Sequence, residues 1–355
     1  MNSAAAERVK RASPPQAALR WRRNLAWLAG CLLLPLVVTA AEPPLPSESG
    51  DTATLATVVV SGEQPGPGLW KVSEGEHVLW ILGTLSPLPE KMTWISRDIE
   101  ATIAASQEVI LAPGASLGVK GGMLRGVFLL PSLLAARNNP DGARLEDVLP
   151  AELHARWRVL KDRYIGRDRG IEKRRPIFAA QELFIEAMED SGLSLEDTVG
   201  KAVKKAARRH KRTLTEPGVE LRVEAPGAAL REFRKSPLDD IDCFTRTLSR
   251  LETDIDAMKL RANAWASGDI EALRALPFED QFRLCSDAIL SASVVEERGL
   301  GDIRQRVANA WLTAAEDALR RNSVSFAILP MRHLLEPDGL LSDLGKRGYL
   351  IEVPQ

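Results

Sequence analysis

The hydrophobic positions in the middle of the chain repeat at the spacing of helices. One stripe, with steps of four, four, three and four residues, marks one face of an amphipathic helix: Leu149, Leu153, Trp157, Leu160 and Tyr164. Further helices are predicted over residues 176–190 and 195–210. The longest stripe predicts one long helix that stops near Gly268, and it runs through Phe244, Leu248, Leu251, Ile255, Met258, Ala262 and Trp265. We assign these stripes to the hydrophobic core.

Apolar strands precede the helical middle. Residues 68–72 and 77–82 flank a short polar loop and predict a β-hairpin. A helix over residues 94–106 and a buried strand over residues 108–111 are expected to follow. The N-terminal part of the domain therefore contributes strands to a sheet.

The C-terminal end predicts a helix, a strand, a second helix and a last strand. Asp302 is placed to cap the first helix. Residues 324–329 form an apolar strand, residues 340–346 a short helix and residues 348–353 the last strand. Strands at both ends with helices between them indicate one α/β-type domain (mixed α+β). Its central sheet is built from N- and C-terminal strands, with a largely helical middle section.

The composition fits a folded domain and excludes some classes of function. Of the 355 residues, 45% are hydrophobic and 27% are charged, which is enough to bury a core and too mixed for a wholly disordered chain. The net charge of −1 supplies no global field that would attract nucleic acid, so no nucleic-acid partner is expected. Four histidines and three cysteines limit metal chemistry from the start.

The net charge of −1 is the sum of a basic N-terminal segment and an acidic remainder. Residues 1–41 hold six basic residues and one acidic residue, a net charge of +5, which leaves −6 for the rest of the chain. The apolar run over residues 25–38 is shorter than the roughly 20 residues that span a bilayer, and small residues follow it. We predict a signal peptide over residues 1–41, a flexible linker over residues 42–67 and a domain over residues 68–355. The protein is expected to be exported, to the periplasm.

The processing of this N-terminus leaves alternatives open. Cleavage after Ala40 or Ala41 would remove the apolar run and leave no transmembrane domain. Leu28-Ala29-Gly30-Cys31 is similar to a lipobox, so lipidation of Cys31 would instead give a lipoprotein. An uncleaved anchor is the third option. Because the apolar run continues past Cys31, ordinary cleavage is favoured.

Two cysteines remain after such processing. In an exported protein Cys243 and Cys285 form a candidate disulfide, and the alternative is two buried thiols. The crosslink would tie the start of the long helix to a helix after Pro277.

Other sequence features favour ordinary structural roles. The basic stretch over residues 201–212 lacks interleaved aromatics and predicts a solvated helix end, with an anionic envelope polymer or lipid surface as the alternative. The glycine-rich residues 114–126 fit no phosphate-binding spacing and predict a flexible loop over the sheet edge. No Gly-x-Ser-x-Gly motif surrounds Ser86, which argues against a serine hydrolase.

Two strand ends carry related motifs. The first runs Trp80-Ile81-Leu82-Gly83-Thr84-Leu85-Ser86. The second runs Phe326-Ala327-Ile328-Leu329-Pro330-Met331-Arg332-His333 and precedes a final Gly348-Tyr349. This order resembles the TraB/GumN family, whose members begin with a tryptophan-containing hairpin that leads into Gly-Thr-x-His. They end with Gly-x-x-His and a Gly-Tyr strand. The resemblance covers roughly residues 68–354.

The resemblance implies a metal site, but this sequence departs from the pattern. In metal-dependent relatives two histidines and an acidic residue after the next strand form a metal-peptidase-like site, where zinc could activate water. Gly83 and Thr84 match the first motif, whereas Ser86 stands at the place of its histidine. Ala112 stands where relatives often carry glutamate, and Pro330 replaces the glycine of the second motif.

Only one histidine stands at a ligand position. His333 matches the second motif and is a weak metal candidate, whereas His77, His154 and His210 have no ligand spacing to it. A serine hydroxyl is a poor zinc ligand, and an alanine side chain cannot bind metal. No catalytic residue and no cofactor are therefore predicted, with a divalent metal such as zinc as the alternative.

The sequence thus predicts a non-catalytic binding or scaffolding protein of the bacterial envelope with a degenerate metal site. Its partner would be an envelope protein or polysaccharide. Two alternatives stay open: a metal-dependent peptidase or hydrolase with a rearranged site, and an accessory protein of exported polysaccharide production. The last of these follows from the family name and from no residue of this chain.

Overall fold

The structure is a computed structural model. It describes residues 62–64, 66–94, 97–118, 122–223, 225–276, 281–290, 295 and 300–354. The predicted signal peptide, Cys31 and the cleavage positions Ala40 and Ala41 lie outside the described residues, as do residues 42–61 of the predicted linker. Within the described ranges, none of the helices combines the length and the apolar character that crossing a membrane requires.

The predicted N-terminal hairpin is present. Strands β2 (Leu69–Glu74) and β3 (His77–Thr84) pair antiparallel, with Glu74 opposite His77. Gly75 occupies the turn at φ 57°, a left-handed conformation that glycine adopts without a steric penalty. The side chains of Trp70, Val72 and Ile81 are fully buried, so the hairpin contributes directly to the core.

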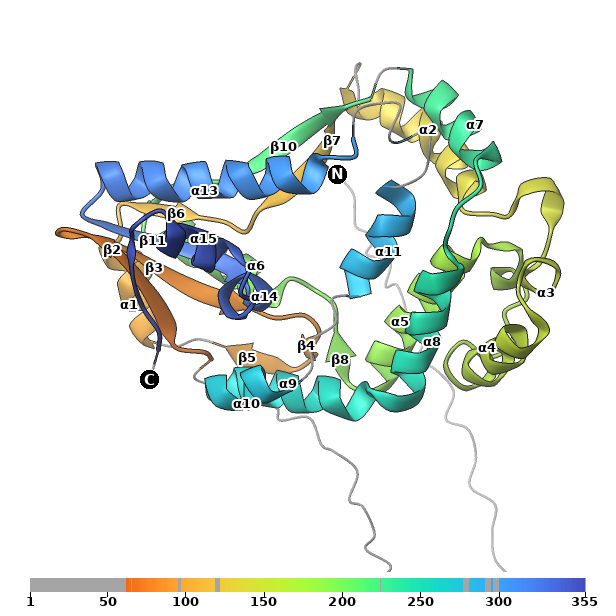
Figure 1. Ribbon diagram of the computed structural model, residues 1–355, viewed down its shortest axis with the longest axis horizontal. Coiled ribbons are helices and arrows are strands. Elements are labelled where there is room, and N and C mark those ends of the chain that lie inside the picture. The colour runs from red at the N-terminus through yellow and green to blue at the C-terminus, as the bar shows by residue number, and fades with distance from the viewer. Residues whose placement is uncertain are drawn as a thin grey trace, which may run out of the picture. The chain divides into compact units, whose positions relative to one another are not determined.

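The main sheet joins the two ends of the domain. Strand β11 (Val324–Pro330) lies between β3 and β6 (Glu108–Ile110) and is parallel to both. Strand β9 (Thr213–Thr215) pairs with β6, and β12 (Leu350–Glu352) pairs antiparallel with β2. The strand order is β12-β2-β3-β11-β6-β9. Figure 1 shows β2, β3, β6 and β11 with α13 on one side of them and α1 on the other. The mixed α/β class, with N- and C-terminal strands in one central sheet, is confirmed.

Helices flank the parallel strands. Helix α1 (Arg97–Ala105) follows β3 and contacts α6 (Thr198–Arg209), whereas α13 (Ile303–Arg321) precedes β11 and contacts α15 (Leu340–Lys346). The chain crosses the sheet in one direction from β3 to β6 and returns in the other from β9 to β11. Right-handed crossovers in opposite directions place α1 and α13 on opposite faces. Helix coverage on both faces explains why β11 is an almost unbroken apolar run.

The N-terminal helix is shorter than its sequence pattern predicts. Trp94 belongs to strand β5 (Met92–Trp94), which pairs in parallel with β1 (Gly62–Gln64), and α1 begins only at Arg97. Strand β1 lies inside the segment predicted as a linker. Trp94, which the sequence pattern assigns to the helix, is therefore held in a strand by its pairing with β1.

The helical middle contains α4 (Ala151–Tyr164), α5 (Pro176–Asp190), α8 (Ile241–Thr253) and α9 (Ile255–Ser267). The prediction of one long helix over the last two is wrong, because the chain breaks at Asp254 (φ −115°, ψ 1°). The Asp254 carboxylate lies 3.6 Å from Arg250 Nε and 3.3 Å from Arg261 Nη2, one residue on each helix. Gly268 ends α9 in a left-handed conformation, as expected.

The glycine-rich stretch is not the flexible loop that its composition predicts. Strand β7 (Gly114–Gly118) pairs in parallel with β10 (Gly218–Arg222), and helix α2 (Gly122–Ala136) follows and packs on α7 (Pro226–Lys235). A Cβ at Gly218 would lie 2.7 Å from the Gly114 carbonyl oxygen. The glycine therefore permits a close strand pairing that a larger residue would obstruct.

The remaining elements are short. Strands β4 (Leu88–Pro89) and β8 (Leu193–Ser194) pair antiparallel. The others are η1 (Pro140–Gly142), α3 (Leu145–Val148), η2 (Ile171–Lys173), α10 (Ile270–Ala275), α11 (Gln281–Leu290) and α14 (Met331–Leu335).

A disulfide joins Cys243 of α8 to Cys285 of α11, as predicted. Residues 277–280 and 291–294, on either side of α11, lie outside the described residues. Ile177, Ala288 and Ile289 pack around the two cysteines and form a small cluster apart from the main core. The crosslink and this cluster together hold α11 against α5 and α8.

Replacing both Cys243 and Cys285 by serine is expected to lower the free energy of unfolding by about 4 kcal/mol. The disulfide closes a 42-residue separation and restricts the unfolded chain. Urea unfolding of the chain from Glu42 onward measures the change. Dithiothreitol should lower the stability of the parent protein to that of the double variant and leave the variant unchanged. A parent protein insensitive to reductant would contradict this expectation.

Candidate functional site

The motif positions predicted from the sequence converge at one edge of the sheet. Gly83 and Thr84 end β3, and Pro330 ends β11 directly opposite Thr84. Ala112 follows β6 by two residues, and β6 is the other parallel neighbour of β11. The carboxyl ends of neighbouring parallel strands lie at the same edge, where open α/β sheets commonly bind ligands. We call this the carboxyl edge.

Gly83 has a structural role at this edge. Its carbonyl oxygen accepts a 2.9 Å hydrogen bond from the buried indole Nε1 of Trp265. A Cβ at Gly83 would overlap the Met331 Sδ and would lie 3.3 Å from the ring of Trp70. Glycine is therefore needed here so that the hairpin, α9 and α14 can pack together.

Ser86 is exposed at the start of the following loop. Its hydroxyl donates a long, 3.5 Å hydrogen bond to the carbonyl oxygen of Leu195, between β8 and α6. The serine that stands at the first histidine position therefore contacts backbone rather than a catalytic partner.

Ala112 lines a cavity of about 370 Å³, which we call the sheet-edge cavity. Its walls come from the segments that follow β6 and β9, from β7, β10 and β11, and from the first turns of α6. The lining comprises Leu111, Ala112, Gly114, Ala115, Ser116, Asp197, Gly200, Lys201, Lys204, Glu216, Pro217, Gly218 and Ile328. The position at which a family-type glutamate would stand therefore opens onto a cavity.

The sheet-edge cavity carries charges of both signs. Lys204 Nζ lies 2.7 Å from Glu216 Oε1, and its hydrogen bond holds the pKa of Glu216 below the usual value. Lys201 pairs with Glu196 at 2.6 Å and likewise lowers the pKa of that carboxyl. Asp197 Oδ1 accepts a hydrogen bond from Gly200 N and caps α6. With two ammonium and two carboxylate groups in its lining, the cavity suits a polar ligand with groups of both signs.

A second cavity, of about 450 Å³, lies between α5 and α11. This α5–α11 cavity is mostly apolar, and its lining comprises Ile177, Gln181, Phe184, Ile185, Glu189, Ser194, Leu195, Glu196, Cys285, Ser286 and Ile289. Residues 194–196 line this cavity, and Asp197, next in the chain, lines the sheet-edge cavity. The two cavities therefore flank one short segment, which Ser86 contacts.

His333 lies in the single turn of α14 and is half-buried. Its Nε2 accepts a hydrogen bond from Arg332 Nε at 3.3 Å. The α-carbon of Gly339 approaches the His333 backbone so closely that a Cβ there would lie 2.5 Å from the His333 carbonyl oxygen. His333 is not among the residues that line either cavity.

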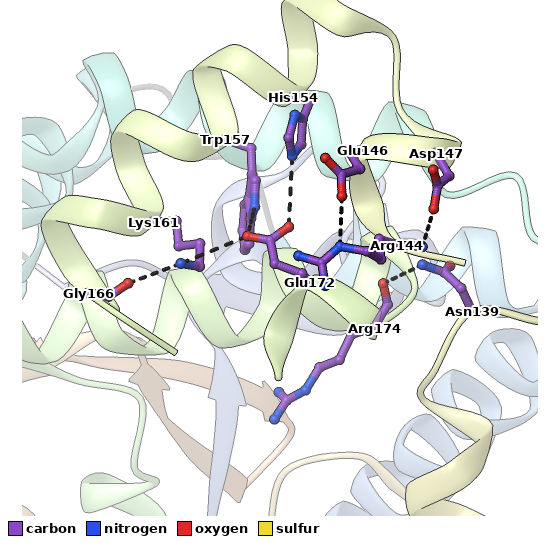
Figure 2. Close-up of polar contacts among 10 residues, drawn as sticks. All are labelled: Asn139, Arg144, Glu146, Asp147, His154, Trp157, Lys161, Gly166, Glu172 and Arg174. Carbon is purple, nitrogen blue, oxygen red and sulfur yellow. Dashed lines mark hydrogen bonds and ion pairs between the residues drawn. The ribbon is translucent and has the colours of Figure 1, made fainter. Parts of the chain in front are cut away.

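The structure gives His154 and His210 partners of their own. His154 Nε2 lies 3.8 Å from Glu172, a buried carboxylate that also accepts a 3.1 Å hydrogen bond from Trp157 Nε1. Lys161 Nζ approaches the same carboxylate at 3.8 Å (Figure 2). His210 Nε2 lies 3.4 Å from Glu100 Oε1. The Glu172 cluster connects α4 to η2, and we assign it a structural role.

The residues at the motif positions do not fit a divalent metal. A serine hydroxyl, a methyl group and one imidazole that accepts a hydrogen bond from an arginine are a poor donor set for zinc. Within the described part of the chain, no group of three or more His, Cys, Asp and Glu residues could hold a metal ion. The donor set at the carboxyl edge therefore supports no chemical step through a metal.

Lys201 and Lys204 are site residues that the sequence pattern does not reveal. The basic stretch predicts a solvated helix end, and Lys201 is 65% exposed; both lysines also line the sheet-edge cavity from the first turns of α6. Their signal in the sequence is the i, i+3 spacing shortly after Asp197, a helix-capping residue.

Comparison with known proteins agrees with the sequence motifs. The family model described as the TraB/PrgY/gumN family matches residues 68–353. No curated protein and no solved structure matches the chain.

Replacing Gly83 by alanine is expected to lower the free energy of unfolding by about 1–3 kcal/mol, because the added methyl group overpacks the contact with Met331 and Trp70. Gly114→Ala is the matched control, since a Cβ there meets no atom within 4 Å, and its change should stay within about 0.5 kcal/mol. Urea unfolding compares the two. Equal stabilities would show that the packing does not require glycine at position 83.

Proposed function

The chain belongs to the TraB/PrgY/gumN family, and on this premise we propose that it is an exported, non-catalytic binding protein of the bacterial envelope. One observation carries the proposal. The motif positions converge at the carboxyl edge, but Ser86 contacts a backbone carbonyl and Ala112 lines a cavity. His333 accepts a hydrogen bond from its neighbour. The edge therefore offers room for a ligand without a donor set for a metal.

Two features support export to an oxidising compartment. Residues 1–41 combine a basic start, a short apolar run and small residues at its end, the pattern of a signal peptide. The Cys243–Cys285 disulfide suits the periplasm, since disulfides persist in oxidising environments.

The two cavities indicate the class of ligand. The α5–α11 cavity offers an apolar lining, and the sheet-edge cavity, on the other side of residues 194–197, offers ammonium and carboxylate groups. A peptide segment presents apolar side chains beside charged and amide groups and matches both linings. A polysaccharide has no comparable apolar side chain for the first cavity. We therefore favour an exposed peptide segment of an envelope protein as the partner.

The disulfide contributes to this binding role. Cys285 lines the α5–α11 cavity, and its crosslink to Cys243 holds α11 as one wall. Preorganised walls reduce the entropy that binding would otherwise cost.

Zinc titration tests the non-catalytic assignment. The chain from Glu42 onward is expected to bind zinc without stoichiometric tight affinity in calorimetry and to leave a panel of peptides uncleaved. His333→Ala should change neither result. Tight one-to-one binding that His333→Ala abolishes, together with peptide cleavage that depends on the same residue, would show a working metallopeptidase.

Selection from a random peptide library tests the ligand class. We expect enrichment of peptides that carry an apolar residue close to charged residues, and Ile289→Lys should abolish their binding by placing a charge in the α5–α11 cavity. Val159→Lys, at a residue 70% exposed on α4, is the matched control and should bind normally. Equal binding by both variants would contradict the assignment of this cavity.

A further inference from the structure

Helix α2 exposes an apolar face. Its 15 residues include a single charged one, Arg125, and their side chains are described from Leu129 onward. Leu130, Leu133 and Leu134, at i, i+3 and i+4, lie on one side of the helix and are 51%, 51% and 52% exposed. Isolated exposed leucines are ordinary, but three adjacent ones on one helix face form a patch that calls for an explanation.

Helix α7 packs against a neighbouring side of α2. Leu129 packs 3.7 Å from the position that a Cβ would take on Gly227, near the start of α7. Ala136, at the end of α2, is buried. Among the described residues α7 is the only helix with which α2 makes extensive contact, and this contact leaves the three leucines about half exposed.

A buried arginine fixes both helices to the rest of the domain. Arg175 N donates to the carbonyl oxygen of Arg137, one residue past α2, at 2.9 Å. Arg175 Nη2 donates to the carbonyl oxygens of Ser236 (2.6 Å) and Arg234 (3.3 Å) at the end of α7. Its guanidinium also lies 5.2 Å from the centre of the Phe233 ring. The apolar face is thus presented by a firmly anchored helix pair.

Helix α7, which packs on α2, carries basic residues. Arg231, Arg234 and Lys235 are exposed on α7 and line a polar cavity of about 450 Å³ between α7 and residues 138–141, which begin two residues after the end of α2. Two acidic residues, Asp141 and Glu232, share this lining, so its net charge is +1. The exposed apolar face and the cationic cavity therefore both belong to the α2–α7 helix pair.

We propose that the α2–α7 pair docks on the surface of an anionic phospholipid bilayer. Leu130, Leu133 and Leu134 enter the boundary between headgroups and acyl chains, and Arg231, Arg234 and Lys235 contact the phosphates. The combination of an apolar face and flanking basic residues is that of helices that lie in the membrane interface. At 15 residues, α2 is shorter than the roughly 20 that a span requires, so it lies on the membrane.

Charge complementarity favours a bilayer over a second copy of the chain. A two-fold interface buries the same patch on both subunits. It would bring two sets of Arg231, Arg234 and Lys235 into one contact, with only Asp141 and Glu232 from each copy to offset them. An anionic surface meets the net positive charge of this lining with opposite charge.

Vesicle sedimentation tests the proposal. The chain from Glu42 onward contains every described residue and lacks the apolar residues 25–38, which would bind vesicles independently. It should sediment with vesicles of equal parts phosphatidylglycerol and phosphatidylcholine, and much less with phosphatidylcholine alone. Replacing Leu130, Leu133 and Leu134 by serine should reduce the partition coefficient on anionic vesicles at least tenfold. Changing Arg231, Arg234 and Lys235 to glutamine should do the same.

Matched controls separate this surface from general effects. Val159→Ser with Leu260→Ser removes exposed apolar residues elsewhere, and Lys91→Gln with Arg97→Gln and Arg158→Gln removes three exposed cations elsewhere. Both controls should bind like the parent protein, and circular dichroism should show all variants folded. Three results would overturn the proposal: no binding by the parent protein, equal loss in the controls, or a dimer that the leucine variant converts to a monomer.

Discussion

The pairing of β11 with β3 and β6 is the interaction on which the rest of the structure depends. Val324 pairs opposite Val78, and Phe326 lies between Trp80 and Val109, so one strand from the C-terminal end joins two strands from the N-terminal end. Closing such long loops costs chain entropy, although this cost rises only slowly with length. The buried apolar run of β11 offsets the cost, and the parallel pairing creates the carboxyl edge with the sheet-edge cavity.

At the carboxyl edge, packing fixes one motif position and leaves other motif positions open to the surface or to a cavity. Gly83 is fixed by packing, because Trp265 binds its carbonyl oxygen and Met331 fills the space where a side chain would stand. Ser86 is exposed, and Ala112, which packs against the edge of the core, also faces a cavity. Residues that serve packing and residues that serve chemistry are thus separate here. This separation allows the fold to support the binding role that we propose.

Helix α5 connects the proposed peptide cavity with the proposed membrane surface. Arg175, just before α5, holds the ends of α2 and α7, and Ile177 lines the α5–α11 cavity. Asp240 accepts a hydrogen bond from Ile177 N. Burial lowers the pKa of Arg175 and raises the pKa of Asp240, because both groups lose hydration inside the protein. A protein docked through α2 would therefore present its peptide cavity at a fixed distance from the membrane.

Local patterns determined much of this protein. The bounds of α5 and α15, the strand at β11 and the motif at Gly83 follow from periodicity and residue type, because these record which side of each element is buried. Tertiary contacts decided the strand within residues 114–118 and the cavity beside Lys204. In both cases the deciding partner lies far away in the sequence: β10 beside β7, and Glu216 opposite the lysine. The sequence pattern predicts which side chains are buried, whereas the partners that bury them depend on how distant segments fold together.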